Sequence, residues 1–176
     1  KLNIMLKLSV VLATRNEEEN IGRCLESVKN IASEIVIFDE YSTDKTKEIA
    51  ESFKAKVFLE PHHDIFHITK QKALEKAKGE WILQLDADEV VTPELAKEII
   101  STVDGSPSTV HNKLFLRHQK LIEERDGKIG KDDGEVMGYF IPRRNMFLGK
   151  PLIYAGVYPD GVIRLVKNGY AKFPCK

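Results

Sequence analysis

The chain has 176 residues, which fits one domain of the usual size of roughly 100 to 200 residues. Hydrophobic residues make up 42% and charged residues 31% of the sequence, and these proportions exclude disordered, collagen-like and disulfide-rich classes. The 27 basic and 27 acidic residues balance. No overall positive field therefore attracts nucleic acid, and we expect no nucleic-acid partner.

The cysteine content and the length of the hydrophobic runs indicate the cellular compartment of the protein. Cys24 and Cys175 form no C-x-x-C pair and no cluster with histidine, which excludes a disulfide framework and favours a reducing compartment. The longest apolar run, Leu8 to Ala13, is far shorter than the roughly 20 residues of a membrane-spanning helix. Lys1 to Leu6 is too short for a complete signal peptide. We expect a cytoplasmic protein without a transmembrane segment, with peripheral contact at the inner face of the membrane left open.

Strands and helices are predicted to alternate along the first hundred residues. The run 8–13 contains consecutive β-branched residues and predicts a strand that is buried on both faces. A helix is predicted from Glu17, with Asn16 as its N-cap. Its buried stripe comprises the apolar residues at helical spacing, which are Ile21, Leu25, Val28 and Ile31.

The same alternation continues to residue 103. Further strands are predicted over 34–38, 55–59 and 80–85. Further helices are predicted after Ser42 or Thr43, over 68–78 with Gly79 closing the helix, and after Thr92, where a proline suits the first helical position. This order predicts an α/β fold, Rossmann-like, with a mostly parallel sheet flanked by helices.

After residue 103 the alternation ends, and an irregular α+β third is predicted. A turn-rich loop at 104–108 precedes a predicted amphipathic helix over 109–125, and a charged, glycine-rich loop follows at 126–134. The inward residues of that helix are predicted to be Val110, Leu114, Leu121 and Ile122. Short strands are predicted around 136–141 and 162–166. We divide the one domain into the parts 1–103 and 104–176.

Ligands of open parallel sheets bind at the carboxyl ends of the strands, which directs attention to 14–17, 39–44 and 86–89. Asp86 and Asp88 follow a hydrophobic strand, and their two-residue spacing is expected to aim both carboxylates to the same side of an extended chain. A pair of this kind holds Mg²⁺ or Mn²⁺ when water and substrate phosphates complete the shell. A solvated loop is the alternative interpretation of the pair alone.

The loops after the first two strands are also informative. Asp39 ends the second strand and has no capping role to explain it, whereas helix capping is the simplest explanation for Ser42, Thr43 and Asp44. The first loop lacks glycine, which argues against a dinucleotide-binding fingerprint and a P-loop. His63 and His67 are spaced like zinc ligands, but we interpret their segment as a loop without a third ligand.

The chain resembles the family 2 glycosyltransferases with the GT-A fold. The segments that carry the resemblance are LSVVLATRNEEENIGRCLESV, DEYSTDKTKEIAESF, KQKALEKAKGEWILQLDADEVVTPEL and GYFIPRRNMFLGKPLIYAGVYPDGVIRLV. They occur in the family's order and cover most of the chain. The last of them is similar to the branch that includes bacterial lipopolysaccharide-core glycosyltransferases.

The resemblance implies a role for specific residues toward a nucleotide sugar. The nucleotide-contacting first loop falls on Thr14, Asn16 and Glu17, and the base-contacting acid falls on Asp39. The metal and ribose motif falls on Asp86 and Asp88. The family's usual Arg-Asn pair before the fourth strand appears as Lys70-Gln71, which keeps a positive charge, and its usual glycine in the second loop is replaced by Lys45.

We therefore expect a glycosyltransferase, hexosyltransferase-like, that moves a sugar from a nucleotide-sugar donor, foremost a UDP-sugar, to an acceptor hydroxyl. The resemblance implies inversion at the anomeric carbon, a divalent cation as cofactor, a glycan or glycolipid acceptor, and a role in cell-envelope glycan or lipopolysaccharide synthesis. Residues 1–103 would bind the nucleotide sugar, and residues 104–176 would form the acceptor side. Arg143 and Arg144 are candidates for contacting the diphosphate or the acceptor, with surface solvation as the alternative.

The catalytic base is the least defined part of this expectation. The branch continues into a short His-Glu motif where this chain reaches Lys176, so we expect a catalytic domain truncated at its C-terminus. Within the chain Asp160, between Pro159 and Gly161, is the best candidate for the base, and a simple Pro-Asp-Gly turn is the alternative. Nucleotidyl transfer, or a non-catalytic binding module on the same fold, is the alternative function.

Overall fold

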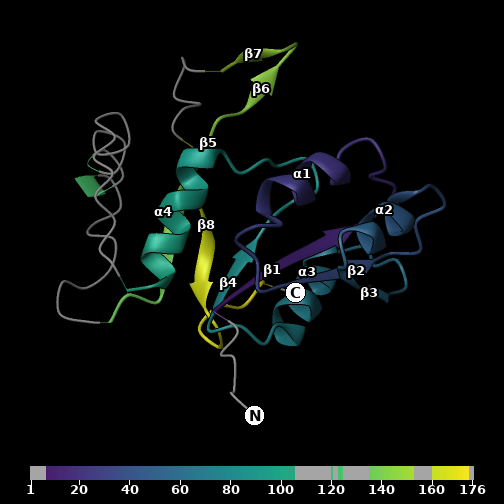
Figure 1. The fold of residues 1–176 in the computed structure, drawn as a ribbon, viewed down its shortest axis with the longest axis horizontal. Helices are drawn as coiled ribbons and strands as arrows, with labels where there is room; N and C mark the ends of the chain where they lie inside the picture. Colours follow the sequence, from purple (N-terminus) through teal and green to yellow (C-terminus); the bar gives the residue numbers. More distant parts are fainter. Residues whose placement is uncertain (1–6, 106–119, 121–122, 125–134, 153–159, 175–176) are drawn as a thin grey trace. The chain divides into compact units, whose positions relative to one another are not determined.

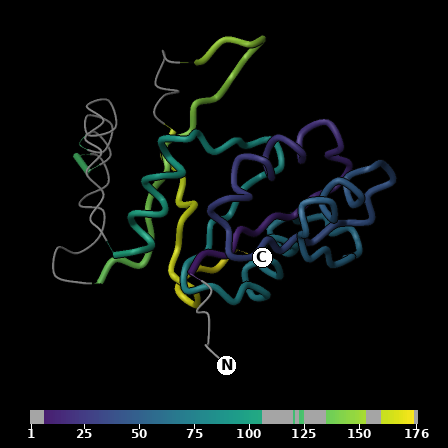
Figure 2. The backbone as a smooth tube through the Cα atoms, in the orientation of Figure 1, coloured from purple at the N-terminus to yellow at the C-terminus, as the bar shows by residue number. Residues whose placement is uncertain are grey.

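The computed structural model describes residues 7–105, 120, 123–124, 135–152 and 160–174. Strands and helices alternate along the first hundred residues, as the backbone path in Figure 2 shows. The elements of that part are β1 (Leu8–Thr14), α1 (Ile21–Val28), β2 (Glu34–Asp39), α2 (Thr46–Ser52), β3 (Lys56–Leu59), α3 (Phe66–Lys76), β4 (Trp81–Gln84) and α4 (Pro93–Val103). The remaining strands are β5 (Gly138–Arg143), β6 (Met146–Phe147), β7 (Lys150–Pro151) and β8 (Asp160–Lys167).

The chain divides into two compact units, one formed by 1–108 with 166–176 and the other by 109–165. In the first unit the strands lie in the order β3-β2-β1-β4 and pair in parallel (Figure 1). In the second unit β5 lies beside β8, and β6 pairs with β7 in an antiparallel hairpin. The predicted α/β class and parallel sheet are confirmed.

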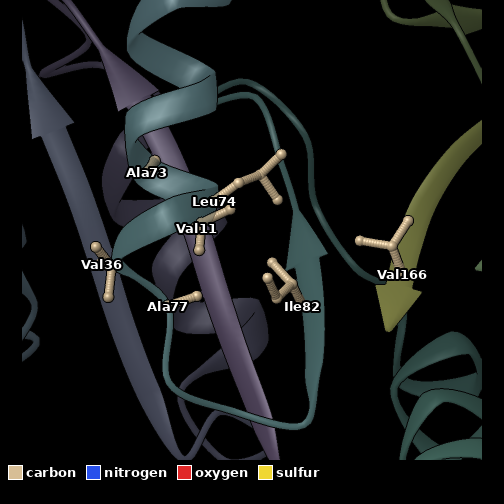
Figure 3. Packing of buried hydrophobic residues seen from close by; sticks show 7 residues of the cluster. All are labelled: Val11, Val36, Ala73, Leu74, Ala77, Ile82 and Val166. Carbon is tan, nitrogen blue, oxygen red and sulfur yellow. The ribbon is translucent and has the colours of Figure 1, made fainter. Parts of the chain in front are cut away.

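One cluster of the core of the first unit lies between the sheet and α3. All seven residues of β1 are buried, as expected for a central parallel strand. Figure 3 shows Ala73 and Leu74 of α3 directed toward β1 and β4. The cluster that they form consists of buried aliphatic side chains from four strands and α3, which are Val11, Val36, Ala73, Leu74, Ala77, Ile82 and Val166.

The first helix begins later than the sequence predicts. Asn16 is not an N-cap, because its backbone is left-handed with φ at 54° and its side chain bonds to the next loop. A turn over 17–20 follows, in which the amides of Asn20 and Ile21 donate to the carbonyl of Glu17, and α1 starts only at Ile21. The predicted stripe is nevertheless buried at Ile21, Leu25 and Val28.

Two further helix ends differ from prediction for similar reasons. Ser42 and Thr43 do not cap α2, because both side chains bond to Asn16 or Asp39, and the helix starts at Thr46. Helix α3 ends at Lys76, and Gly79 is not its cap. A Cβ at Gly79 would lie 2.7 Å from the Ser9 amide nitrogen, so glycine is required there for close backbone approach.

The predicted start of α4 is confirmed, because Thr92 Oγ1 accepts a hydrogen bond from the Leu95 amide and Pro93 is the first helical residue. The predicted helix over 109–125 is described only at Lys120, Glu123 and Glu124, which are helical. Its predicted inward residues, Val110, Leu114, Leu121 and Ile122, lie outside the described residues. The expected strands near 136–141 and 162–166 are present as β5 and β8. In the described part of the chain, no helix has the length and apolar character needed to cross a membrane.

Candidate functional site

The candidate site lies at the carboxyl ends of β1, β2 and β4. Thr14, the last residue of β1, pairs in register with Asp39, the last residue of β2. The third segment, 86–89, follows β4, which is the other neighbour of β1. The parallel order β2-β1-β4 therefore gathers the three predicted loops at one edge of the sheet, as expected from the topology.

Asp39 is buried and its carboxylate joins the first two loops. Its Oδ2 accepts hydrogen bonds from Thr14 Oγ1 at 3.0 Å and Ser42 Oγ at 2.5 Å, and its Oδ1 accepts from the Ser42 amide at 2.8 Å. Asp39 does not cap α2, but its side chain has a local structural role that the sequence did not indicate, because it accepts from the backbone amide three residues later. Whether Asp39 also contacts a base stays a prediction.

Asn16 extends the connection between these loops. The backbone amide of Asn16 donates to Ser42 Oγ at 2.9 Å, and the side-chain Oδ1 of Asn16 accepts from the backbone amide of Thr43 at 2.8 Å. The left-handed backbone of Asn16 presents both groups to the second loop. Asparagine tolerates this conformation better than most residues other than glycine.

Glu17 and Glu18 complete the connection. The Glu17 amide donates to Thr46 Oγ1 at 2.7 Å, and the Glu18 amide donates to Asp44 Oδ2 at 3.0 Å. Burial alone would raise the pKa of Asp44, but hydrogen bonds from Thr46 and the Glu18 amide outweigh it and lower the pKa. The two loops are thus held together through side chains before any ligand arrives.

Tyr41 also lies in the second loop, with a left-handed backbone at φ 48° and a half-exposed side chain. Its neighbour Glu40 is fully buried, with Oε1 2.5 Å from Thr69 Oγ1 and Oε2 2.6 Å from His62 Nδ1. The sequence did not single out Glu40, because the partners come from a separate loop and from α3.

Asp86 and Asp88 lie in a turn rather than in an extended strand. Strand β4 ends at Gln84, and the Glu89 amide donates to the Asp86 carbonyl at 3.0 Å. The argument that strand alternation aims both carboxylates to one side therefore does not apply. Asp88 is exposed, and among the residues that the structure describes its carboxylate has no hydrogen-bond or ion-pair partner.

Asp86 is held by several groups. Its Oδ1 lies 2.5 Å from Lys70 Nζ and 3.2 Å from Gln84 Nε2, and its amide donates to Glu89 Oε2 at 2.9 Å. Lys70 lies in α3 and its side chain is only 12% exposed, so the positive charge is directed at the site rather than at bulk solvent. The structure thus brings the predicted residues Lys70 and Asp86 together.

Gln71, the neighbour of Lys70, lies elsewhere. Its Oε1 accepts from the Phe173 amide at 2.8 Å, and its Nε2 donates to Glu75 Oε1. Gln71 therefore anchors the segment around Phe173 to α3. Of the pair Lys70 and Gln71, Lys70 is the residue that contacts the turn over residues 86–89, which we call the acidic turn.

Cys24 reports on the electrostatics of the acidic turn. Its thiol is buried in α1, 3.6 Å from the carbonyl oxygen of Asp86. Burial, followed by the charges of Glu89, Asp88 and Asp86, raises the pKa of Cys24 to about 12. The thiol is therefore neutral at physiological pH.

The two histidines considered as zinc ligands have separate partners. His63 Nε2 lies 2.8 Å from Glu60 Oε1, and His67 Nδ1 lies 3.3 Å from the Pro174 carbonyl oxygen. The prediction that both lie in a loop is wrong for His67, which is part of α3. The neighbouring His62 contacts Glu40. Over the described ranges, no group of three or more histidine, cysteine, aspartate or glutamate side chains is arranged to hold a metal ion.

The second unit contains the predicted residues Arg143, Arg144 and Asp160. Arg143 Nη2 lies 2.5 Å from Asp160 Oδ2, and Asn145 Nδ2 lies 3.4 Å from the same oxygen. Asp160 is the first residue of β8 and Gly161 the second, whereas Pro159 of the predicted Pro-Asp-Gly turn lies outside the described residues. Arg144 is exposed.

Comparisons with known proteins agree on one family. The family model described as Glycosyl transferase family 2 matches residues 9–128. A protein of Rickettsia bellii named "Uncharacterized glycosyltransferase" is 44% identical over 94 residues, which cover 53% of this chain and 31% of the relative. The glycosyltransferase SunS of Bacillus subtilis is 36% identical over 81 residues, which cover 45% of this chain and 19% of SunS.

A solved structure supports the same conclusion. The crystal structure of TarS 1-349 from S. aureus superposes with a TM-score of 0.51 and 29% identity, covering 56% of this chain and 32% of that one. The match with the Rickettsia bellii and Bacillus subtilis relatives spans a third of their length or less. The family match, the glycosyltransferase relatives and the GT-A architecture together show that the chain belongs to glycosyl transferase family 2, a family of enzymes.

Proposed function

We propose that the protein transfers a sugar from a nucleotide-sugar donor, foremost a UDP-sugar, to an acceptor hydroxyl, with inversion at the anomeric carbon. The observation that carries the proposal is the arrangement at the carboxyl edge of the sheet. There the hydrogen-bonded loops around Asp39 and the pair of Lys70 and Asp86 flank the end of β1, and the exposed carboxylate of Asp88 lies in the same turn as Asp86.

The nucleoside half of the donor is assigned to the first two loops. Thr14, Asn16 and Glu17 line the start of the first loop, and Asp39 is the proposed acceptor of a hydrogen bond from a ring N–H of the base. The hydrogen bonds between the loops hold these groups in place in the free protein, so that little ordering cost arises on binding.

The diphosphate half is assigned to the acidic turn and α3. Lys70 supplies a positive charge beside Asp86, which offsets the repulsion between the acidic turn and the phosphates. Because the side chain of Lys70 is mostly shielded from solvent, this charge interacts more strongly than an exposed lysine would.

The donor atoms at the acidic turn fit a divalent cation such as Mn²⁺ or Mg²⁺. Asp88 offers an exposed carboxylate, and Asp86 offers a side chain that is 30% exposed and oriented by Lys70 and Gln84. Hard cations of this kind are bound by one or two carboxylates when phosphates and water supply the other ligands. When bound, the cation would neutralise charge on the leaving diphosphate.

The acceptor side is assigned to the second unit. Asp160 is the proposed base that takes the acceptor's proton, and Arg143 positions its carboxylate through their ion pair. Arg144 is assigned to an anionic group of the acceptor. We further propose a glycan or glycolipid acceptor in cell-envelope or lipopolysaccharide synthesis, and a cytoplasmic location that includes the inner face of the membrane.

Isothermal titration with UDP and GDP, each with and without Mn²⁺, tests the proposal. We expect binding of one nucleoside diphosphate that strengthens with Mn²⁺, and hydrolysis of a matching sugar nucleotide in a donor screen. Failure of both diphosphates to bind under either condition would favour a non-catalytic module. Pyrophosphate release from a nucleoside triphosphate would favour nucleotidyl transfer.

A further inference from the structure

The β6–β7 hairpin presents a tight turn built from unusual residues. Met146 pairs with Pro151 and Phe147 pairs with Lys150, and Leu148 and Gly149 form the two-residue connection. Both connecting residues have left-handed backbones, with φ at 48° and 74°. This is the geometry of a type I′ turn, in which Asn-Gly or Asp-Gly is favoured and leucine is not.

The side chains at the tip of this hairpin are apolar and exposed. Met146 is 58% exposed, Phe147 is 63% exposed and Leu148 is 86% exposed. Leu148 adds almost nothing to the burial of apolar surface and adopts a backbone conformation that is strained for its side chain. The folding of the hairpin therefore does not explain its apolar tip, which Figure 1 draws at the β6–β7 connection.

The charged residues of the sequence stretch that contains the tip are basic, and the carboxylate of Asp160, which follows this stretch, pairs with Arg143. The stretch 136–159 contains Arg143, Arg144 and Lys150 and no aspartate or glutamate, although acidic and basic residues are balanced over the whole chain. Lys150 lies in β7 beside the turn, and Arg144 lies just before β6. Both residues are exposed.

An apolar tip flanked by cations fits the surface of an anionic bilayer. Three side chains at a hairpin tip fall well short of the roughly 800 Å² that each partner buries in a stable protein interface. In a bilayer each apolar side chain is transferred into the acyl boundary independently, and each nearby cation is attracted to anionic headgroups.

We propose that the β6–β7 hairpin docks on an anionic lipid bilayer, with Phe147 and Leu148 inserted at the headgroup boundary and Lys150 at the headgroups. The inference deepens the proposed function and rests on its location at the inner face of the membrane, but docking itself requires neither donor nor cation. The β6–β7 hairpin would thus be the part of this chain that contacts the membrane surface.

Co-sedimentation of the 176-residue chain with vesicles tests this proposal. The probes are vesicles of phosphatidylcholine alone and of phosphatidylcholine mixed with phosphatidylglycerol. We expect binding only to the mixed vesicles, with weaker binding at high salt because the headgroup attraction is screened. Leu148→Asp should lower binding about tenfold or more, and Lys150→Gln should lower it roughly fivefold.

The variants are chosen so that the fold is retained. Aspartate tolerates the left-handed position of Leu148 better than leucine does, and circular dichroism would check the fold. Tyr170→Asp, at a residue 64% exposed in the other unit, is the matched control and should bind as the wild type does.

Three results would overturn the proposal. They are equal binding to both kinds of vesicle, unchanged binding of Leu148→Asp, and a concentration-dependent dimer in sedimentation velocity that Leu148→Asp abolishes while no vesicles bind. UDP titration of Leu148→Asp should match the wild type, which separates failure of docking from failure of the proposed function.

Discussion

Lys70 Nζ lies 2.5 Å from Asp86 Oδ1, which connects the middle of α3 to the turn after β4. This ion pair joins a helix residue and a loop residue that the sequence places in separate motifs. It also places one cation beside a turn whose other charged groups, Asp88 and Glu89, are acidic. In the free protein the positive charge of Lys70 therefore offsets part of the negative charge at the candidate diphosphate site.

Lys70→Gln should weaken UDP binding without metal by roughly tenfold, because a charge-assisted contact of about 1.5 to 3 kcal/mol is removed. The same change should increase the dependence of UDP binding on Mn²⁺, since Asp86 becomes available to a cation. Titration calorimetry measures both effects. Lys76→Gln, in the same helix, is the control, and equal behaviour of the two variants would contradict the role of Lys70.

Asp88→Asn should abolish the effect of Mn²⁺ on UDP affinity while leaving the melting temperature unchanged. The exposed carboxylate has no partner among the described residues, so its removal should change the free energy of unfolding very little. Asp64→Asn, another exposed acid, is the control for the loss of one negative charge. Metal-dependent affinity that survives in Asp88→Asn would remove this residue from the proposed site.

Asp39→Asn and Asp39→Ala separate structure from base recognition. The alanine variant loses three accepted hydrogen bonds in a buried place and should unfold more easily, by about 1 to 3 kcal/mol. The asparagine variant keeps the shape and one acceptor oxygen. If Asp39 contacts the base, the asparagine variant should bind uridine about tenfold more weakly without metal at a temperature where it is folded. Unaltered binding would make Asp39 a structural residue alone.

Asp160→Asn should lower turnover by about a hundredfold or more while donor affinity stays at the wild-type value, because a base acts only on the acceptor's proton. The measurement combines a sugar-transfer assay with UDP titration. Asn145→Ala removes a weaker contact to the same carboxylate and serves as the comparison. Turnover near the wild-type rate in Asp160→Asn would assign the base to another residue.

Glu34 should make stability depend on pH on the acid side. Burial would raise the pKa of its carboxyl, but hydrogen bonds from Lys56, Ser9 and the Lys78 amide outweigh burial and hold the pKa below its ordinary value. The resulting stabilisation is present above the unfolded pKa of about 4.3 and is lost as pH falls through the folded pKa.

The matching experiment is chemical unfolding of Glu34→Gln between neutral and acid pH. The variant should lose about 1 to 3 kcal/mol of unfolding free energy at pH 7 and show a flatter decline in acid. Glu48→Gln, at an exposed residue of α2, should retain the wild-type profile. An equally steep acid decline in Glu34→Gln would contradict the assignment.

The strands of the first unit were predictable because burial on both faces leaves a local signal, as the β-branched run in β1 shows. The first residues of α1 and α2 were not predictable in this way. Asn16, Ser42 and Thr43 are residue types that commonly cap helices. Here they form hydrogen bonds between two loops that are about 26 residues apart in sequence. No local pattern reports such contacts.

The candidate site was predictable in location more than in contacts. The topology rule predicts that the loops after β1, β2 and β4 meet at one edge of the sheet, and Thr14 and Asp39 do meet there. The partner of Lys70 and the burial of Glu40 depend on how α3 packs, which a single sequence does not encode in its spacing. The β6–β7 hairpin was missed because its two-residue strands are too short for a periodic pattern.

The central position of β1 has a consequence for the order of folding during synthesis. Its partner β2 leaves the ribosome soon after it, but its other partner, β4, follows only after two more helices and β3. Until then one edge of a strand whose seven residues are all buried in the fold has no hydrogen-bonding partner, which is the condition for wrong pairing between nascent chains. We expect slow translation between residues 40 and 80 to favour aggregation, and chaperone binding to this interval to favour recovery of folded protein.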